Sequence, residues 1–169
     1  MDTTTQKVFI IPAQYDVLDP AERTADLAVV NRNGYRATLA TRIFKIDELV
    51  FPVVGECMDH PTVYTIQVAA NRHVVTLYGK YVNHSCHPNC CFDTEHLIFR
   101  ALRTIAAEEE ITFDYNTTEY DLCWPFQCCC GAIDCLRYIR GYKYLSAEHR
   151  QRLVSLTADY LKSMHKADQ

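Results

Sequence analysis

Three cysteines stand in a row at Cys128, Cys129 and Cys130, followed by Gly131 and then by Cys135. Zinc takes four thiolate or imidazole ligands in a tetrahedron, with zinc–sulfur distances of about 2.3 Å. Alternate residues of an extended chain face the same way, so Cys128 and Cys130 can share one ion while Cys129 points elsewhere. Gly131 permits the sharp turn that would return Cys135 to that ion. The spacing therefore predicts three ligands of a zinc site.

The fourth ligand is not determined by this spacing. The candidates are a histidine or one of the cysteines Cys57, Cys86, Cys90, Cys91 and Cys123. The chain has nine cysteines, an odd number that argues against a fully paired disulfide framework, and clustered thiols in a reducing compartment point first to metal. The alternative, a group of buried free thiols acting as small apolar side chains, fits three consecutive cysteines poorly. A closed site with four protein ligands would be structural rather than catalytic.

The composition is that of an ordinary globular protein and restricts the partners. The 169 residues, 49% hydrophobic and 22% charged, are enough for one domain with its own core. A net charge of -4 does not suit a protein that holds nucleic acid by its phosphates, whereas it suits a lysine-rich peptide. No apolar run approaches the roughly 18–20 residues of a membrane span, and the N-terminus lacks a secretory pattern. We therefore expect an intracellular protein, in the nucleus or the cytoplasm, without membrane contact or direct nucleic-acid binding.

The elements that would position the cysteines are mostly strands. β-rich runs bounded by turn residues lie at 8–11, 27–30, 48–51, 63–68, 73–78, 97–102 and 110–115. A helix is indicated only near the end, where Ser146 can cap it and apolar residues repeat at helical spacing. The repeat consists of Leu153, Leu156, Tyr160, Leu161 and Met164. We interpret it as packing on the edge of the domain rather than as a partner site, and we expect a mostly β fold with a C-terminal helix.

Three motifs follow one another along the chain. Residues 81–89 read Tyr-Val-Asn-His-Ser-Cys-His-Pro-Asn, residues 109–115 end in Phe-Asp-Tyr, and a Cys-x-Cys-Gly pattern leads to Cys135. In this order they resemble the SET-domain protein lysine methyltransferases that carry a post-SET zinc motif. The resemblance covers roughly residues 25–142. It implies a SET fold of short β-sheets around a pseudoknot, with an N-terminal strand or extension at 1–24, the SET domain at 25–119, the post-SET zinc segment at 120–142 and a C-terminal helix at 143–169.

The resemblance also implies a binding site for a cofactor. By this similarity Asn83 and His84 would contact S-adenosylmethionine, together with Tyr35, Arg36 and Ala37. Ala37 stands where the family's first motif, Gly-x-Gly, has its second glycine. An alanine would obstruct a left-handed turn or a very close contact with the cofactor at this position.

Further roles follow from the same resemblance. Cys86 would be the missing zinc ligand beside the three cysteines of the post-SET motif. Tyr115 would be the catalytic tyrosine, and Tyr64 would line the lysine channel from a strand. Phe113 would occupy the position that limits how many methyl groups fit, and a phenylalanine there implies room for two or three. Read without the family, Tyr115 would be taken for a core aromatic.

The predicted function is that of an S-adenosylmethionine-dependent protein lysine N-methyltransferase with structural zinc, with a histone tail as the favoured substrate. Methyl transfer needs a neutral and aligned amine, although the reference pKa of lysine is about 10.4. A narrow aromatic channel disfavours the ammonium by desolvation, and the positive sulfur of the cofactor repels it. Two alternatives stay open: a SET-fold enzyme that methylates a non-histone or small-molecule amine, and a catalytically silent SET module that binds a partner.

Overall fold

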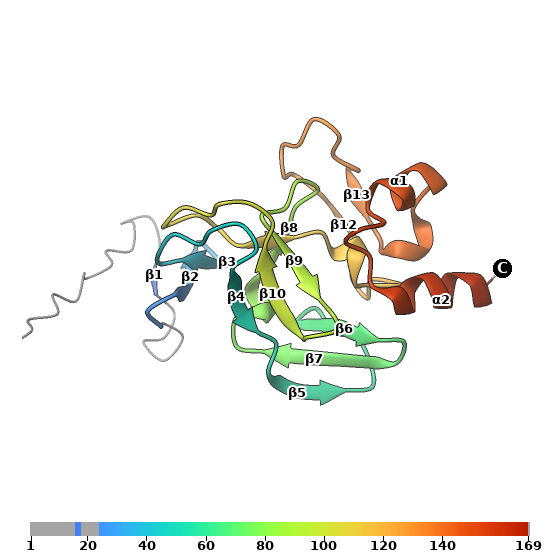
Figure 1. The fold of residues 1–169 in the computed structure, drawn as a ribbon, viewed down its shortest axis with the longest axis horizontal. Coiled ribbons are helices and arrows are strands. Elements are labelled where there is room, and N and C mark those ends of the chain that lie inside the picture. The colour runs from blue at the N-terminus through green and yellow to red at the C-terminus, as the bar shows by residue number, and fades with distance from the viewer. Residues whose placement is uncertain (1–15, 18–23, 169) are drawn as a thin grey trace, which may run out of the picture.

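The computed structural model describes residues 16–17 and 24–168, and within them the chain is built mainly from short strands (Figure 1). The strand predicted at 8–11 and most of the extension at 1–24 lie outside the described residues. In the described part, three sheets have three strands each and two sheets have two strands each. The prediction of a mostly β fold is confirmed. No helix among the described residues has the length and apolarity to cross a bilayer.

The first sheet has the order β1-β2-β3 and contains Asp16–Val17, Leu27–Arg32 and Tyr35–Ala40. Asn33 and Gly34 join β2 to β3, and both have a positive φ, 51° and 88°. A two-residue turn with two positive φ angles matches the twist of a hairpin, and asparagine and glycine tolerate that conformation best. The hairpin places the first residues of β3 in contact with the motif at 81–89.

Two further antiparallel sheets surround the core. One has the order β4-β10-β9 and contains Leu49–Pro52, Ile98–Ala101 and Cys90–Asp93. The other has the order β5-β7-β6 and contains Gly55–Met58, Arg72–Thr76 and Thr65–Ala69. The strands predicted at 27–30, 48–51, 63–68, 73–78 and 97–102 are thus confirmed, with each end displaced by two residues or fewer.

Two short pairs complete the sheet structure. β8 (Asn83–His84) and β11 (Thr112–Phe113) pair in parallel, and β12 (Phe126–Gln127) and β13 (Tyr138–Ile139) pair antiparallel. Short 3₁₀ helices η2 (Gly79–Tyr81), η3 (Tyr115–Thr117) and η4 (Tyr142–Tyr144) connect the elements.

The strand predicted at 110–115 is wrong in extent, because only Thr112–Phe113 is extended. The Asp114 side chain accepts a hydrogen bond from the backbone N–H of Asn116 and so caps η3. This local bond competes with a continued strand and turns Tyr115 into the 3₁₀ helix.

The main core is aromatic and lies between the central sheets. Phe51 and Phe99 stack with ring centroids 4.6 Å apart, and Phe99 meets Phe113 edge to face at 5.1 Å. Aromatic pairs in these arrangements add about 0.5–1.5 kcal/mol to the free energy from buried area. Phe113, only 2% exposed, therefore connects the core to the parallel pair β8–β11.

The single helix predicted after Ser146 is divided into α1 (Ala147–Arg152) and α2 (Asp159–Ala167). Ser146 caps α1 as expected, since its Oγ accepts from the N–H of His149 at 3.2 Å. The Thr157 hydroxyl then bonds back to the carbonyl of Leu153 at 2.8 Å, and the N–H of Ala158 donates to Thr117 at 2.9 Å. A tertiary hydrogen bond thus takes the donor that a continuous helix would have used.

Candidate functional site

The two central motifs meet in the parallel pair β8–β11. Asn83 pairs with Thr112 and His84 pairs with Phe113. The N–H of Ser85 continues the ladder by donating to the carbonyl of Phe113 at 3.0 Å. Motifs that are separate in the sequence therefore lie side by side, and the backbone fixes their register.

Asn89, the last residue of the first motif, holds this register from the side. It is buried, and its Oδ1 accepts from the N–H of Thr112 at 2.8 Å while its Nδ2 donates to the carbonyl of Glu110 at 2.7 Å. A buried amide can satisfy a donor and an acceptor on one strand at the same time. The structural role of this asparagine therefore lies in joining the two motifs.

Asn83 connects β8 to the start of β3. Its Nδ2 lies 3.0 Å from the Tyr35 hydroxyl, 2.8 Å from the Arg36 carbonyl and 2.7 Å from Oε1 of Glu110. The Tyr35 hydroxyl itself donates to Glu110 at 2.8 Å. The network orients the Asn83 amide and brings Tyr35 beside it.

Ala37 does not stand in a turn. It belongs to β3, pairs with Val30 and is fully buried against Val30 and Leu39. Its φ is not positive, so the expected obstruction of a left-handed turn does not arise. The Arg36 guanidinium points to the Tyr81 hydroxyl at 3.1 Å. Neither Arg36 nor Ala37 lines the cavity along the parallel pair β8–β11, and their contact with a cofactor stays a prediction.

A cavity of about 530 Å³ runs along the parallel pair. This volume lies within the range of small-molecule sites. Six of the residues predicted to act in binding or catalysis line it: Tyr35, Tyr64, Asn83, His84, Phe113 and Tyr115. Cys128 and Cys130 reach its wall as well, so the cysteine cluster borders the same space.

Tyr115 is held at both ends. Its hydroxyl donates to the carbonyl of Val82 at 2.8 Å, and its backbone N–H donates to Nδ1 of His84 at 3.2 Å. Its ring lies 4.8 Å from that of Phe113 and 6.0 Å from that of Phe126. Burial raises the pKa of the Tyr115 hydroxyl, which therefore stays protonated and neutral at physiological pH.

Tyr64 lies on the cavity wall, but it does not come from a strand as predicted. It stands in the turn before β6, where the N–H of Thr65 donates to the carbonyl of Thr62. Its ring meets that of Tyr81 edge to face at 6.3 Å, and 48% of its surface is exposed. Tyr64 therefore belongs to the mouth of the cavity, whereas the buried Phe113 belongs to its interior.

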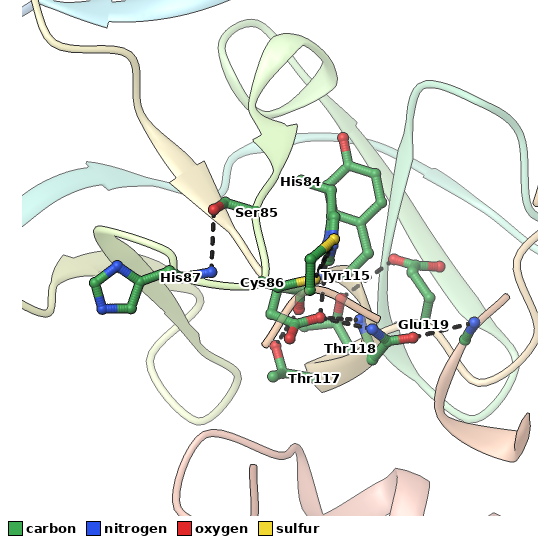
Figure 2. Close-up of polar contacts among 12 residues, drawn as sticks. His84, Ser85, Cys86, His87, Tyr115, Thr117, Thr118 and Glu119 are labelled. Carbon is green, nitrogen blue, oxygen red and sulfur yellow. Dashed lines mark hydrogen bonds and ion pairs between the residues drawn. The ribbon is translucent and has the colours of Figure 1, made fainter. Parts of the chain in front are cut away.

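Both nitrogens of the His84 ring are occupied. Because an N–H group can only donate, Nδ1 must accept from Tyr115, and the ring proton lies on Nε2, which is 3.3 Å from Sγ of Cys86 (Figure 2). Burial lowers the pKa of His84 to about 4, so the ring is neutral and forms no ion pair with Asp114, 3.6 Å away. The His84 side chain is 1% exposed. Its backbone is therefore the part that can face a ligand.

The four predicted zinc ligands come together. The sulfur atoms of Cys86, Cys128, Cys130 and Cys135 all lie within 4.8 Å of one another. The Sγ atoms of Cys86 and Cys135 are 3.9 Å apart, close to the separation of about 3.8 Å that a tetrahedron with zinc–sulfur bonds of about 2.3 Å requires. Cys129 is exposed and lies outside the cluster. The donor set and its spacing fit a zinc ion.

Local structure forms this cluster. The hairpin β12–β13 closes the loop at 128–137, and the N–H of Cys128 donates to the carbonyl of Arg137 at 2.8 Å. Gly131 has a φ of +75°, which permits the turn back to Cys135 as the sequence predicted. Cys86 is brought from β8 by the parallel pairing, outside the loop.

Burial opposes the ionisation of two of the clustered thiols, Cys86 and Cys128. Burial raises the pKa of Cys128 to about 11 and raises that of Cys86 further. Burial also acts to raise the pKa of Cys130, but hydrogen bonds from Ala132, Cys86 and neighbouring thiols lower it to about 6. Four thiolates at this spacing repel one another, and a divalent metal removes that repulsion.

Most residues of the cavity wall were not predicted from the sequence, and Phe126, Trp124 and Glu119 are three of them. Phe126 places its ring 5.7 Å from that of His84, and Trp124 is exposed at the rim. Glu119 lines the interior although it is only 6% exposed. No local pattern marks a lone glutamate or an aromatic residue as part of a site, and only the position of Glu119, four residues after Tyr115, could have drawn attention to it.

Comparison with known proteins places these motifs in a family. The model of the family described as "SET domain" matches residues 5–116. The methyltransferase flvH of Aspergillus flavus is 39% identical over 69 residues, which cover 40% of this chain and 39% of flvH. A histone-lysine N-methyltransferase of Candida albicans, specific for lysine 36 of histone H3, is 39% identical over 69 residues, covering 37% of this chain and 8% of that protein. Human histone-lysine N-methyltransferase 2B is 36% identical over 73 residues, covering 38% and 3%.

The chain thus spans well under two thirds of the length of these relatives. Among solved structures, KRYPTONITE in complex with mCHG DNA and SAH aligns with a TM-score of 0.49 at 19% identity, over 61% of this chain and 26% of that one. The methyltransferase domain of human SETMAR aligns with a TM-score of 0.48 at 19% identity, over 63% and 54%. Since the family model covers most of the chain and the fold is mostly β with a helical C-terminus, this protein belongs to the SET domain family.

Proposed function

We propose that this SET domain transfers methyl groups from S-adenosylmethionine to a lysine side chain of another protein. The observation that carries the proposal is the single cavity that Asn83, His84, Phe113 and Tyr115 share. The relatives support it, because one is named a methyltransferase and two are named histone-lysine N-methyltransferases.

Tyr115 would orient the amine. Its only hydroxyl proton is committed to the carbonyl of Val82, so its oxygen presents lone pairs to the cavity and can accept a hydrogen bond from the amine. An amine that donates to Tyr115 has its own lone pair directed elsewhere, as an in-line displacement requires. The neutral hydroxyl cannot itself remove a proton from an ammonium, because burial raises its pKa.

The walls of the cavity would favour the neutral amine. Phe113 and Phe126 offer apolar surface, and Tyr64 offers an aromatic face at the mouth. Removing an ammonium from water into such surroundings lowers its pKa. Phe113 carries no hydroxyl that could hold a water beside the amine, so we expect space for a second and a third methyl group.

S-adenosylmethionine, when bound, would supply the methyl group on a positively charged sulfur. Tyr35, the Asn83 amide and the backbone of His84 line the cavity on one side and would hold this molecule. The volume of about 530 Å³ is sufficient for a ligand of that size together with an alkyl amine.

The zinc ion would be structural. With four cysteine ligands it has no open position for a water or a substrate. It would join β8, through Cys86, to the loop at 128–137, and this loop forms one wall of the cavity. The segment at 120–142 would therefore act as a post-SET element, and the boundaries of the SET domain at 25–119 stay a prediction.

A histone tail is the substrate we favour. Two of the relatives act by their names on histone lysines, and a net charge of -4 suits a basic peptide. A histone substrate would place the protein in the nucleus. A small-molecule amine is the second candidate, because the name of flvH, of which this chain covers 39%, gives no protein substrate.

The test is transfer of a labelled methyl group to core histones by the wild type, by Tyr115→Phe and by a matched control, Tyr138→Phe. Tyr138 is exposed in β13 and lies outside the cavity. Label on histones that Tyr115→Phe loses and Tyr138→Phe keeps supports lysine methylation centred on Tyr115. Equal label from all three proteins contradicts the role of Tyr115, and the absence of label from the wild type contradicts the histone substrate.

A further inference from the structure

Glu119 is a buried carboxylate on the wall of the cavity that the proposed function does not use. It is 6% exposed and lines the same space as Tyr115 and Phe113. Among the described residues no lysine, arginine or histidine forms an ion pair with it. A buried carboxylate without a cationic partner is costly to ionise. Such a group is common where a charged ligand binds.

One oxygen of this carboxylate is held and the other is available. Oε1 accepts from the backbone N–H of Gln67 at 2.8 Å. It also accepts from the hydroxyl of Thr118 at 3.3 Å (Figure 2). Oε2 makes no hydrogen bond within the described part of the chain, yet it is not sealed from solvent. Since Glu119 lines the cavity, Oε2 is the atom that can meet a ligand there.

The surroundings keep Glu119 rigid. Tyr160 of α2 packs behind it, with its hydroxyl 2.7 Å from the carbonyl of Gln67 and 2.8 Å from that of Thr118. The backbone N–H of Tyr120 donates to Oε1 of Gln67 at 2.8 Å. These bonds join β6, the segment after η3 and α2 around one carboxylate. A site built on fixed elements can bind a small cation without reorganisation.

We propose that Glu119 receives the ammonium group of the substrate lysine and accepts its proton before methyl transfer. The proposal rests on the methyltransferase function proposed above. One N–H bond of the ammonium breaks, its proton moves to Oε2 of Glu119, and the electron pair stays on nitrogen. That pair then forms the bond to the methyl carbon while the carbon–sulfur bond breaks and its electrons stay on sulfur. The carboxylic acid afterwards returns its proton to solvent.

The pKa of Glu119 is compatible with its role as a general base. Burial raises the pKa of Glu119 to about 7, which brings it close to that of a lysine desolvated in the same cavity. A general base works best when its pKa lies near the working pH. Tyr115 cannot take the proton, because it is neutral and its hydroxyl already donates to Val82. The other titratable groups that line the cavity or pack behind Glu119 are Tyr35, Tyr64, Lys80, His84, Cys123, Cys128, Cys129, Cys130 and Tyr160.

The kinetic test compares Glu119→Gln with the wild type and with Glu95→Gln, which alters an exposed glutamate. Glutamine keeps the acceptor for Gln67 and Thr118 but carries no charge. At pH 7.5 we expect Glu119→Gln to lower kcat/KM for core histones about 100-fold, the usual contribution of a general base. The deficit should shrink about tenfold for each pH unit above 7.5, because solvent then deprotonates the lysine. A purely structural role predicts a deficit that does not change with pH, and this result would overturn the proposal.

A second measurement needs neither a variant that folds nor an active enzyme. The carboxyl carbons of the glutamates are labelled with ¹³C, and the wild-type protein is titrated with n-butylammonium chloride, which has the shape and charge of a lysine side chain. We expect the resonance of Glu119 to shift with n-butylammonium and not with n-butanol. No shift, or an equal shift with the alcohol, overturns the proposal. Failure of the wild type to methylate histones contradicts the proposed histone substrate instead, so the two failures are distinguishable.

Discussion

Replacement of Cys86 by serine tests the zinc site, because the expected loss of folding stability can be calculated. The four sulfur atoms lie within 4.8 Å of one another, and serine substitutes a hard, weakly acidic hydroxyl for one thiolate. Structural zinc sites provide about 10–16 kcal/mol of apparent binding free energy in small peptides at pH 7. Loss of one ligand in four then removes at least about 3 kcal/mol. For a chain of this length, that corresponds to a fall in Tm of about 6–12 °C.

The matched control is Cys90→Ser. Cys90 is 1% exposed in β9 and belongs to the aromatic core rather than to the sulfur cluster. Its replacement buries a hydroxyl without a provided partner and destabilises the fold by about 1–3 kcal/mol, so Tm alone does not separate the two variants. Zinc content does. We expect about one zinc per chain in the wild type and in Cys90→Ser, and much less in Cys86→Ser, by elemental analysis.

A chelator provides the second readout. It should lower the Tm of the wild type and of Cys90→Ser, because removal of the metal costs both proteins the same free energy. It should leave the Tm of Cys86→Ser nearly unchanged. The reasoning is refuted if Cys86→Ser keeps its zinc and its response to the chelator, or if the wild type binds no zinc at all.

Three further predictions concern other parts of the cavity. Phe113→Tyr should shift the product towards monomethyl-lysine, because the added hydroxyl occupies space beside the amine; an unchanged distribution by mass spectrometry would count against this. Burial raises the pKa of Glu119 from 4.5 to about 7, so the folded protein holds this proton more tightly than the unfolded chain. The folded state is therefore most stable, as far as Glu119 is concerned, below about pH 4.5, and it loses this stability as the pH rises through 7. Glu119→Gln should therefore gain about 3 kcal/mol relative to the wild type between pH 4.5 and 8, measured by urea unfolding, and a constant difference would contradict the burial argument. Tyr160→Phe removes the single hydroxyl proton that lies between the carbonyls of Gln67 and Thr118 and should lower the Tm by about 4–8 °C, from a loss of about 2 kcal/mol.

The strands were predictable because their signal is local. Alternating β-branched and apolar residues between turn residues define runs such as 27–30 and 97–102 without reference to the rest of the chain. The helix after Ser146 shows the limit of this reasoning. Its apolar stripe continues through the break, whereas the tertiary hydrogen bond from the N–H of Ala158 to the carbonyl of Thr117 lies at the start of the second helix.

The positions of single side chains show the same limit. Tyr64 was expected on a strand and lies in the preceding turn, because Thr62 and Thr65 bond to each other there. Ala37 was expected at a turn beside a cofactor and packs in the core of β3. In both cases the residue type was compatible with either position. Local hydrogen bonds decided it for Tyr64, and packing against Val30 and Leu39 decided it for Ala37.

Sequence by itself determined what depends on covalent spacing. Cys128, Gly131 and Cys135 lie close enough along the chain for their geometry to predict a shared metal, and the three motifs in order indicated the family. Tertiary structure decided what depends on distant segments. The parallel pair β8–β11 brings Cys86 to the other cysteines and His84 to Tyr115, and β6 and α2 enclose Glu119. The physical reason is that the burial of a side chain and the absence of a charged partner depend on segments that are distant in the sequence. The type of the residue alone does not determine them.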